Sequence, residues 1–134
     1  MSSTVTMLTD GAALSFTGDK VRGDGYYGYN DGLHTIAIDV QDFKARVYIQ
    51  GTLSTNPVEA DWFDIQLASS TDYIQFPADP GNLLGGGTNG DTVTKGYTFQ
   101  GNFVYLRAKV DRSWIDPTPD LANVGTLNKI QLNI

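Results

Sequence analysis

The chain has 134 residues, a formal net charge of −6 at neutral pH and no cysteine. A chain of this length usually forms one domain, which we expect over residues 1–134. The absence of cysteine excludes a disulfide framework and a thiolate metal site. The negative charge repels phosphate backbones and disfavours nucleic-acid binding, while the lack of 18 consecutive apolar residues and of a signal-peptide pattern predicts no membrane span and no signal peptide.

The composition favours turns and strands over helices. Fourteen of the fifteen acidic residues are Asp, and the chain contains fifteen Gly. Asp side chains hydrogen-bond locally in turns and caps, whereas Glu tolerates helix interiors, so this bias disfavours helix. No window shows a sustained period of 3.6 residues.

Nine short segments alternate apolar and polar residues in the manner of strands. In chain order they are STVTMLT near the start, ALSF, HTIAIDV, KARVYIQGTLS, DWFDIQL, DYIQF, GYTF, residues 104–110 and NKIQLNI at the end. The expected core-facing residues are Ile36, Ile38, Val40, Ala45, Val47, Ile49, Gly51, Leu53, Phe63, Ile65, Leu67, Val104, Leu106, Ala108, Val110, Ile130, Leu132 and Ile134. Their neighbours in the alternation, among them Lys44, Thr52 and Phe103, are expected on the outer faces.

Segments rich in Gly, Pro, Asn and Asp separate these strands. They cover residues 17–32, 55–61, 77–95 and 111–125, and we expect loops there. Parallel pairing needs long connections, usually helices, so many short strands without helical crossovers favour antiparallel pairing. The predicted fold is all-β: an antiparallel two-sheet sandwich, jelly-roll-like, with about eight or nine strands.

Few residues are candidates for catalysis. His34 is the lone histidine, and the elbow or oxyanion loop that a Ser/His/Asp triad requires is not visible. Asp61 and Asp64 stand three positions apart in a predicted strand and therefore on opposite faces, which argues against joint acid/base chemistry. A structural or solvated histidine and turn or cap aspartates are the alternatives. We expect no enzyme, no metal and no cofactor, and a hydrolase using these three residues is the least favoured hypothesis.

An RGD tripeptide, Arg22 to Asp24, lies in the first predicted loop. It is a motif of cell adhesion, but three residues are a weak signal, and a turn built around its glycine explains it equally.

A mixed surface of aromatic and basic residues is the stronger functional candidate. Arg46, Tyr48, Tyr105 and Arg107 point away from the core in two predicted strands, and Trp62 lies in a strand between them in sequence. If these strands share a sheet, the five residues form one surface. Arg and Tyr are favoured at protein interfaces because they bury a large area and still hydrogen-bond, so we predict an interface. The alternative is that the protein's own loops cover these side chains.

A second aromatic group lies in the predicted loops. Tyr26, Tyr27 and Tyr29 belong to GDGYYGYNDG, and Trp114 belongs to DRSWIDPTPD. Aromatic rings stack on sugar rings, while Asp and Asn accept hydrogen bonds from sugar hydroxyls. These four residues are therefore the candidate ligand-binding residues of a carbohydrate-binding module.

Three segments carry a resemblance to a known family. They are F-x-x-x-V-Y-I-Q-G-T-L-S-T-N-P-x-x-x-D-W-F from Phe43 to Phe63, YTFQGNFVYLRAKV from Tyr97 to Val110, and GTLNKIQLNI from Gly125 to Ile134. The pattern resembles small virion structural proteins of tailed phages, notably marine T4-like phages of cyanobacteria.

The resemblance implies a non-enzymatic β-sandwich that assembles into a virion as a capsid-decorating, neck or tail-associated component. It implies other virion proteins as partners, a homo-oligomer, and location in a virion assembled in the host cytoplasm. A rigid sheet with variable loops suits repeated, symmetric association. The alternative remains a carbohydrate-binding module, which on a phage would bind host-surface glycans.

Overall fold

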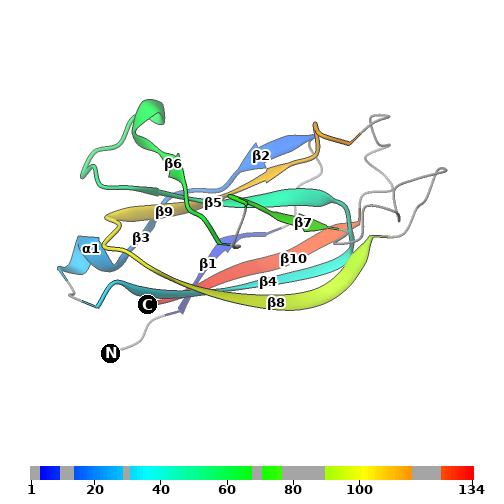
Figure 1. The fold of residues 1–134 in the computed structure, drawn as a ribbon, viewed down its shortest axis with the longest axis horizontal. Helices are drawn as coiled ribbons and strands as arrows, with labels where there is room; N and C mark the ends of the chain where they lie inside the picture. The colour runs from blue at the N-terminus through cyan, green and yellow to red at the C-terminus, as the bar shows by residue number, and fades with distance from the viewer. Residues whose placement is uncertain (1–3, 10–13, 29–30, 68–70, 77–89, 116–124) are drawn as a thin grey trace.

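The computed structural model describes residues 4–9, 14–28, 31–67, 71–76, 90–115 and 125–134. Within these ranges the chain forms ten strands, one four-residue helix and one 3-10 turn (Figure 1). The strands are β1 Thr4–Leu8, β2 Ser15–Thr17, β3 Val21–Arg22, β4 Leu33–Phe43, β5 Ala45–Thr52, β6 Phe63–Asp64, β7 Ile74–Phe76, β8 Asp91–Gln100, β9 Tyr105–Asp111 and β10 Thr126–Asn133. The helix α1 covers Asp24–Tyr27, and the 3-10 turn η1 covers Glu59–Asp61.

The strands form two sheets, and all their pairings are antiparallel. The four-stranded sheet has the order β1-β10-β4-β8, and the six-stranded sheet has the order β2-β9-β5-β6, with β3 also on β9 and β7 also on β5. We can count β2 and β3 as one interrupted strand, and β6 and β7 as another, which leaves eight strands in the described residues. Renumbered along the chain, they have the order 1-8-3-6 in the first sheet and 2-7-4-5 in the second. This is the order of a jelly roll. The predicted all-β, two-sheet sandwich is therefore confirmed.

The chain passes between the sheets most abruptly after β4, where Lys44 alone separates β4 from β5. Just before this crossing Asp42 has a φ of 50°, a left-handed conformation that Asp tolerates better than most residues. Its backbone N–H donates to Thr92 Oγ1 at 2.9 Å, and its Oδ1 accepts from the Gly90 N–H at 2.7 Å. These bonds to the start of β8 hold the bend in place.

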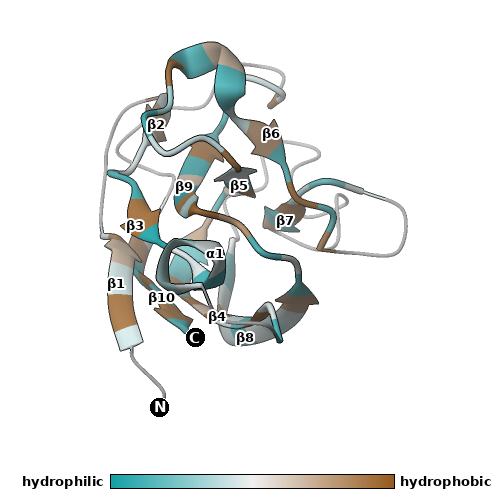
Figure 2. Cartoon of the chain, turned by 90° about the vertical axis from the view of Figure 1, so that its left-hand side faces the viewer, coloured by the Kyte–Doolittle hydropathy of each residue, from teal (hydrophilic) through white to brown (hydrophobic). Residues whose placement is uncertain are grey.

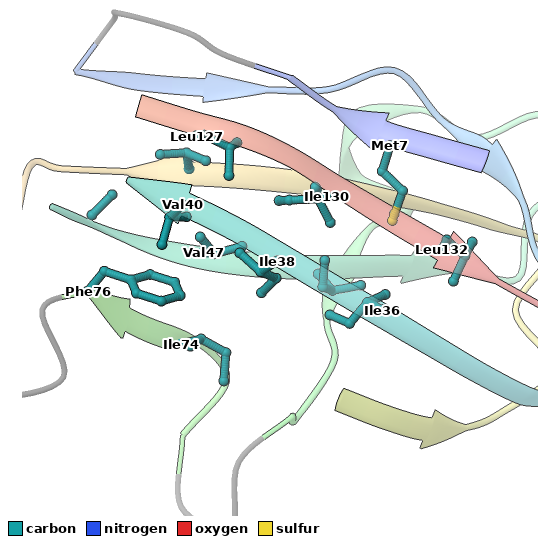
Figure 3. Close-up of a cluster of buried hydrophobic side chains, with 14 of the residues drawn as sticks. Met7, Ile36, Ile38, Val40, Val47, Ile74, Phe76, Leu127, Ile130 and Leu132 are labelled. Carbon is teal, nitrogen blue, oxygen red and sulfur yellow. The ribbon is translucent and has the colours of Figure 1, made fainter. Parts of the chain in front are cut away.

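The core lies between the two sheets (Figure 3). Alternate residues of β4 and β10 meet alternate residues of β5, β7 and β9, because side chains in a strand point to opposite faces in turn. The fully buried apolar residues, with 0% exposure, are Ile36, Ile38, Phe43, Ala45, Val47, Ile49, Phe76, Leu106, Ala108, Val110, Leu127, Ile130 and Leu132. Each large aliphatic side chain buried in this way stabilises the fold by about 1.5–3 kcal/mol.

Several predictions of which residues are buried are wrong near strand ends. Leu53 is 66% exposed because β5 ends one residue earlier, and Thr52 is buried instead. Phe63 is 44% exposed in a strand of two residues. Lys44 is buried at the crossing between sheets. Phe103 packs against the core, because β9 begins two residues later and the alternation does not reach it.

Two predicted loops contain regular structure. The segment 17–32 includes β3 and α1, and the segment 77–95 includes the first half of β8. In the end-on view of Figure 2, α1 lies between the two layers at one end of the sandwich. Two backbone hydrogen bonds attach it there: Gly23 N–H donates to the Val104 carbonyl and Gly25 N–H to the Phe103 carbonyl, each at 2.9 Å.

Candidate functional site

The outer face of the six-stranded sheet carries the predicted interface residues. Strands β5 and β9 are direct neighbours, with Tyr48 opposite Lys109 and Thr52 opposite Tyr105. This register puts Arg46, Tyr48, Tyr105 and Arg107 on one face, while Trp62, just after η1, stacks on Arg107. We call the five residues Arg46, Tyr48, Trp62, Tyr105 and Arg107 the outer-sheet surface. Their side chains share one side of the molecule, as the alternation predicted.

The middle of this surface is organised around Arg107. Its guanidinium lies 4.4 Å from the Trp62 ring, and its Nε donates to Gln50 Oε1 at 2.7 Å. Its Nη1 and Nη2 atoms donate to the two carboxylate oxygens of Glu59 at 3.1 and 2.7 Å. The Arg107 side chain is 12% exposed, whereas that of Glu59 is 84% exposed. Hydrogen bonds from Arg107 hold the pKa of the Glu59 carboxyl below its usual value.

One end of the surface is organised around Arg46. Its guanidinium lies 4.2 Å from the Tyr73 ring and 4.5 Å from the Trp114 ring, and its Nε donates to Gln75 Oε1 at 3.3 Å. The Tyr73 ring also packs at 5.6 Å against Tyr48. Partial burial is the main reason that the pKa of the Tyr48 phenol is raised. Arg46 is thus held in one orientation by two rings and an amide.

The other end of the surface is organised around Tyr105. The Tyr26 ring of α1 packs against it at 5.6 Å, and the Lys20 Nζ lies 5.4 Å from its centre. The Arg22 guanidinium in turn lies 4.6 Å from the Tyr26 ring. Cation–ring contacts therefore occur in the middle and at both ends of the outer face, and such contacts contribute about 0.5–1 kcal/mol each at exposed sites.

The alternative that the protein's own loops cover these residues is partly correct. All five residues of the outer-sheet surface are of intermediate exposure. The turn η1 and Trp62 cover Arg107, and Tyr73 and Trp114 cover Arg46. The guanidinium groups of Arg46 and Arg107 are therefore held by rings and hydrogen bonds rather than extended as free charged ends.

The predicted glycan-binding residues do not come together. Tyr26 and Tyr27 lie side by side on α1, with ring centres 5.3 Å apart, and are 42% and 44% exposed. Trp114 lies three residues beyond the far end of β9, a strand of seven residues that begins at Tyr105 and is about 20 Å long. Tyr29 lies outside the described residues.

A cleft of about 550 Å³ opens beside α1. Its lining residues are Val5, Asp19, Lys20, Val21, Arg22, Tyr27, Tyr105 and Ile134. A hollow of about 260 Å³ adjoins it, shares Asp19 and Lys20, and reaches Trp62 and Arg107. Sequence reasoning missed the contribution of the two cations, Lys20 and Arg22, although both stand close to the tyrosines in the sequence.

His34 has a structural position. Its side chain is fully buried and stacks on Phe99 at 5.1 Å with the ring planes 6° apart. Nδ1 lies 2.8 Å from the Gly32 carbonyl oxygen and must carry the proton, since that oxygen can only accept. Nε2 then accepts from the Asp24 N–H at 3.1 Å. Burial lowers the pKa of this imidazole, against the opposing effect of the Gly32 hydrogen bond.

The same network accounts for the RGD tripeptide. Asp24 is 1% exposed, and its carboxylate accepts a hydrogen bond from the Gly32 N–H. A buried carboxylate of this kind cannot be presented to an adhesion receptor. The tripeptide therefore serves the turn that leads from β3 into α1.

The candidate acid/base aspartates have separate local partners. Asp61 Oδ2 accepts from the Val58 N–H at 2.9 Å within η1, and Asp64 Oδ1 accepts from Gln50 Nε2 at 2.9 Å. Neither bond involves the buried His34. Within the described ranges, no three His, Asp or Glu side chains gather as a metal site would require, and no helix is long and apolar enough to cross a membrane.

Comparisons of the chain with protein-family models, curated proteins and solved structures gave no match.

Proposed function

We propose that this protein is a non-enzymatic structural subunit of a tailed-phage virion, in a capsid-decorating, neck or tail-associated position. It docks on copies of itself or on other virion subunits through the outer-sheet surface. The observation that carries the proposal is the common placement of Arg46, Tyr48, Tyr105 and Arg107 on adjacent strands, with Trp62 stacked on Arg107. The resemblance of three sequence segments to phage virion proteins is the basis for proposing a phage origin.

The composition and rigidity of the surface suit docking. Trp, Tyr and Arg are the residues that contribute most to binding energy at protein interfaces. Here the Arg46 and Arg107 side chains are already held by rings and hydrogen bonds. Immobilising a flexible side chain on binding costs about 0.5–1.5 kcal/mol, so prior fixation reduces this cost.

The size of the surface predicts a weak individual contact. Strand β5 has eight residues and is about 26 Å long, and four neighbouring strands are about 15–20 Å wide. The face therefore offers about 400–500 Å², compared with about 800 Å² per partner in a stable complex. Such a contact becomes effective when symmetry repeats it many times, as in a virion.

Sedimentation over roughly tens to hundreds of micromolar tests self-association at this contact. We expect the wild-type protein to associate as its concentration rises, and Tyr48→Glu to remain monomeric because it puts a charge in the centre of the surface. Thr98→Glu is the matched control, since it adds the same charge to an exposed position of the four-stranded sheet. Immunogold labelling of purified virions tests docking on other subunits. A protein that is monomeric throughout and absent from virions would contradict the proposal.

A further inference from the structure

The cleft beside α1 is lined by Tyr27 and by two cations, Lys20 and Arg22, none of which belongs to the outer-sheet surface. We propose that it binds an acidic oligosaccharide, with one sugar ring against Tyr27 and the sugar carboxylate beside Lys20 and Arg22. The site differs from the four-residue set expected from sequence: it excludes Trp114 and adds the two cations. It is independent of virion assembly, since most of its residues lie outside the outer-sheet surface.

The aromatic part of the site is rigid. Tyr26 and Tyr27 are more than 40% exposed, and their rings meet at 83°. The helix that carries them is fixed by the buried Asp24 and by backbone bonds from Gly23 and Gly25 to the connection before β9. Exposed aromatic rings in fixed positions bind with little loss of conformational entropy. Stacking on a sugar ring is a use that such rings suit.

The cationic part of the site favours an acidic sugar over a neutral one. Lys20 and Arg22 both line the cleft, and among the lining residues in the described part of the chain Asp19 is the one acidic side chain. Contacts with Tyr105 and Tyr26 keep these two cations beside the rings. In a chain with a net charge of −6, two cations at one cleft form a local site for a carboxylate.

The shape of the region favours several linked sugar units. The cleft of about 550 Å³ has the volume of a small-molecule site. It continues into the 260 Å³ hollow that reaches Trp62, and a third hollow of about 400 Å³ shares Asp19 and runs along β1 and β2. Three hollows that share Asp19 suit an extended chain better than a single sugar.

Calorimetry at low salt with defined probes tests the proposal. The acidic probes are tetragalacturonate, tetramannuronate and sialyllactose. The neutral counterparts are the methyl esters of the two uronate tetramers, and lactose for sialyllactose. We expect at least one acidic probe to bind, its neutral counterpart to bind about tenfold more weakly, and salt to weaken the acidic probe. Inorganic phosphate should not displace it, because phosphate has no ring to stack on Tyr27.

Two pairs of variants locate the binding. K20Q/R22Q should weaken the acidic probe about tenfold or more, whereas K95Q/K129Q, which removes the same charge from the four-stranded sheet, should leave it unchanged. Tyr27→Ala should lower the affinity for the acidic probe. Trp114→Ala should leave it unchanged, because Trp114 lies beyond the far end of β9 in the six-stranded sheet. Absence of binding by every acidic probe, equal binding of the neutral counterparts, displacement by phosphate, or unchanged affinity in K20Q/R22Q would each overturn the proposal.

Discussion

Replacing His34 by Phe tests whether the buried histidine holds α1 in place through its hydrogen bonds. Phe keeps an aromatic ring against Phe99 but removes both ring nitrogens. The substitution removes the acceptor of the Asp24 N–H and one of two donors to the Gly32 carbonyl, which still accepts a hydrogen bond from the Gly101 N–H at 2.9 Å. A buried polar group that loses its partner costs about 1–3 kcal/mol, so we expect His34→Phe, which leaves the Asp24 N–H without its acceptor, to lower the free energy of unfolding by about 1–3 kcal/mol.

The same substitution should also remove a pH dependence. Because burial lowers the pKa of His34 below 6.5, the unfolded chain takes up a proton in a range where the folded protein does not. The free energy of unfolding of the wild type therefore falls as the pH decreases through about 6.5, by at most about 1.4 kcal/mol per pH unit. The chain contains one histidine, and carboxyl groups titrate mainly at lower pH, so His34→Phe should be nearly flat between pH 5 and 7.

Urea unfolding curves recorded at a series of pH values from 5 to 7.5 measure both the loss of stability and the loss of its pH dependence. Val47→Ala is the control, because it removes buried volume from the core at a similar cost but leaves His34 intact. It should be less stable than the wild type and keep the same pH slope. An equal slope in His34→Phe, or a wild type that becomes more stable as the pH falls, would refute the role assigned to the buried imidazole.

Three substitutions elsewhere have distinct expected outcomes. Gly96→Ala should raise the free energy of unfolding by about 0.5–1 kcal/mol, because glycine weakens a strand and the added methyl meets only one backbone oxygen, at 3.7 Å. Gly125→Ala should destabilise the protein by more than that, since Gly125 has a φ of 74° and the methyl would overlap the Asp42 backbone. Glu59→Gln should change stability little, because its ion pair with Arg107 is exposed on the carboxylate side. Thermal and urea unfolding of the three variants check these outcomes.

The sequence is sufficient to predict the strand faces where a strand is long and one side is buried. In β4 and β10 the predicted inward residues Ile36, Ile38, Ile130 and Leu132 are fully buried. A slip of one residue would expose such a row, so the apolar pattern specifies the register. The alignment of Tyr48 with the other outer residues follows from the same alternation, once β5 and β9 are neighbours.

The sequence is not sufficient where distant backbone contacts determine the structure. The segment that carries β3 and α1 reads as a loop, because its glycines and aspartates are turn residues. Its structure depends on hydrogen bonds from Gly23 and Gly25 to residues about eighty positions later, and on the buried Asp24. No local pattern encodes these contacts, so the cleft and its cations Lys20 and Arg22 were not predicted.

Tyr105 belongs to both proposed sites, whereas Tyr48 and Tyr27 each belong to only one of them. Tyr105 ends the outer-sheet surface and lines the cleft, where it contacts Tyr26 and Lys20. We expect Tyr105→Ala to weaken both self-association and acidic-oligosaccharide binding, whereas Tyr48→Glu weakens only the first and Tyr27→Ala only the second. Sedimentation and calorimetry on the same three preparations measure the two affinities. If Tyr48→Glu and Tyr27→Ala each reduced both affinities alike, the two surfaces would be one site, and the separation between them would be wrong.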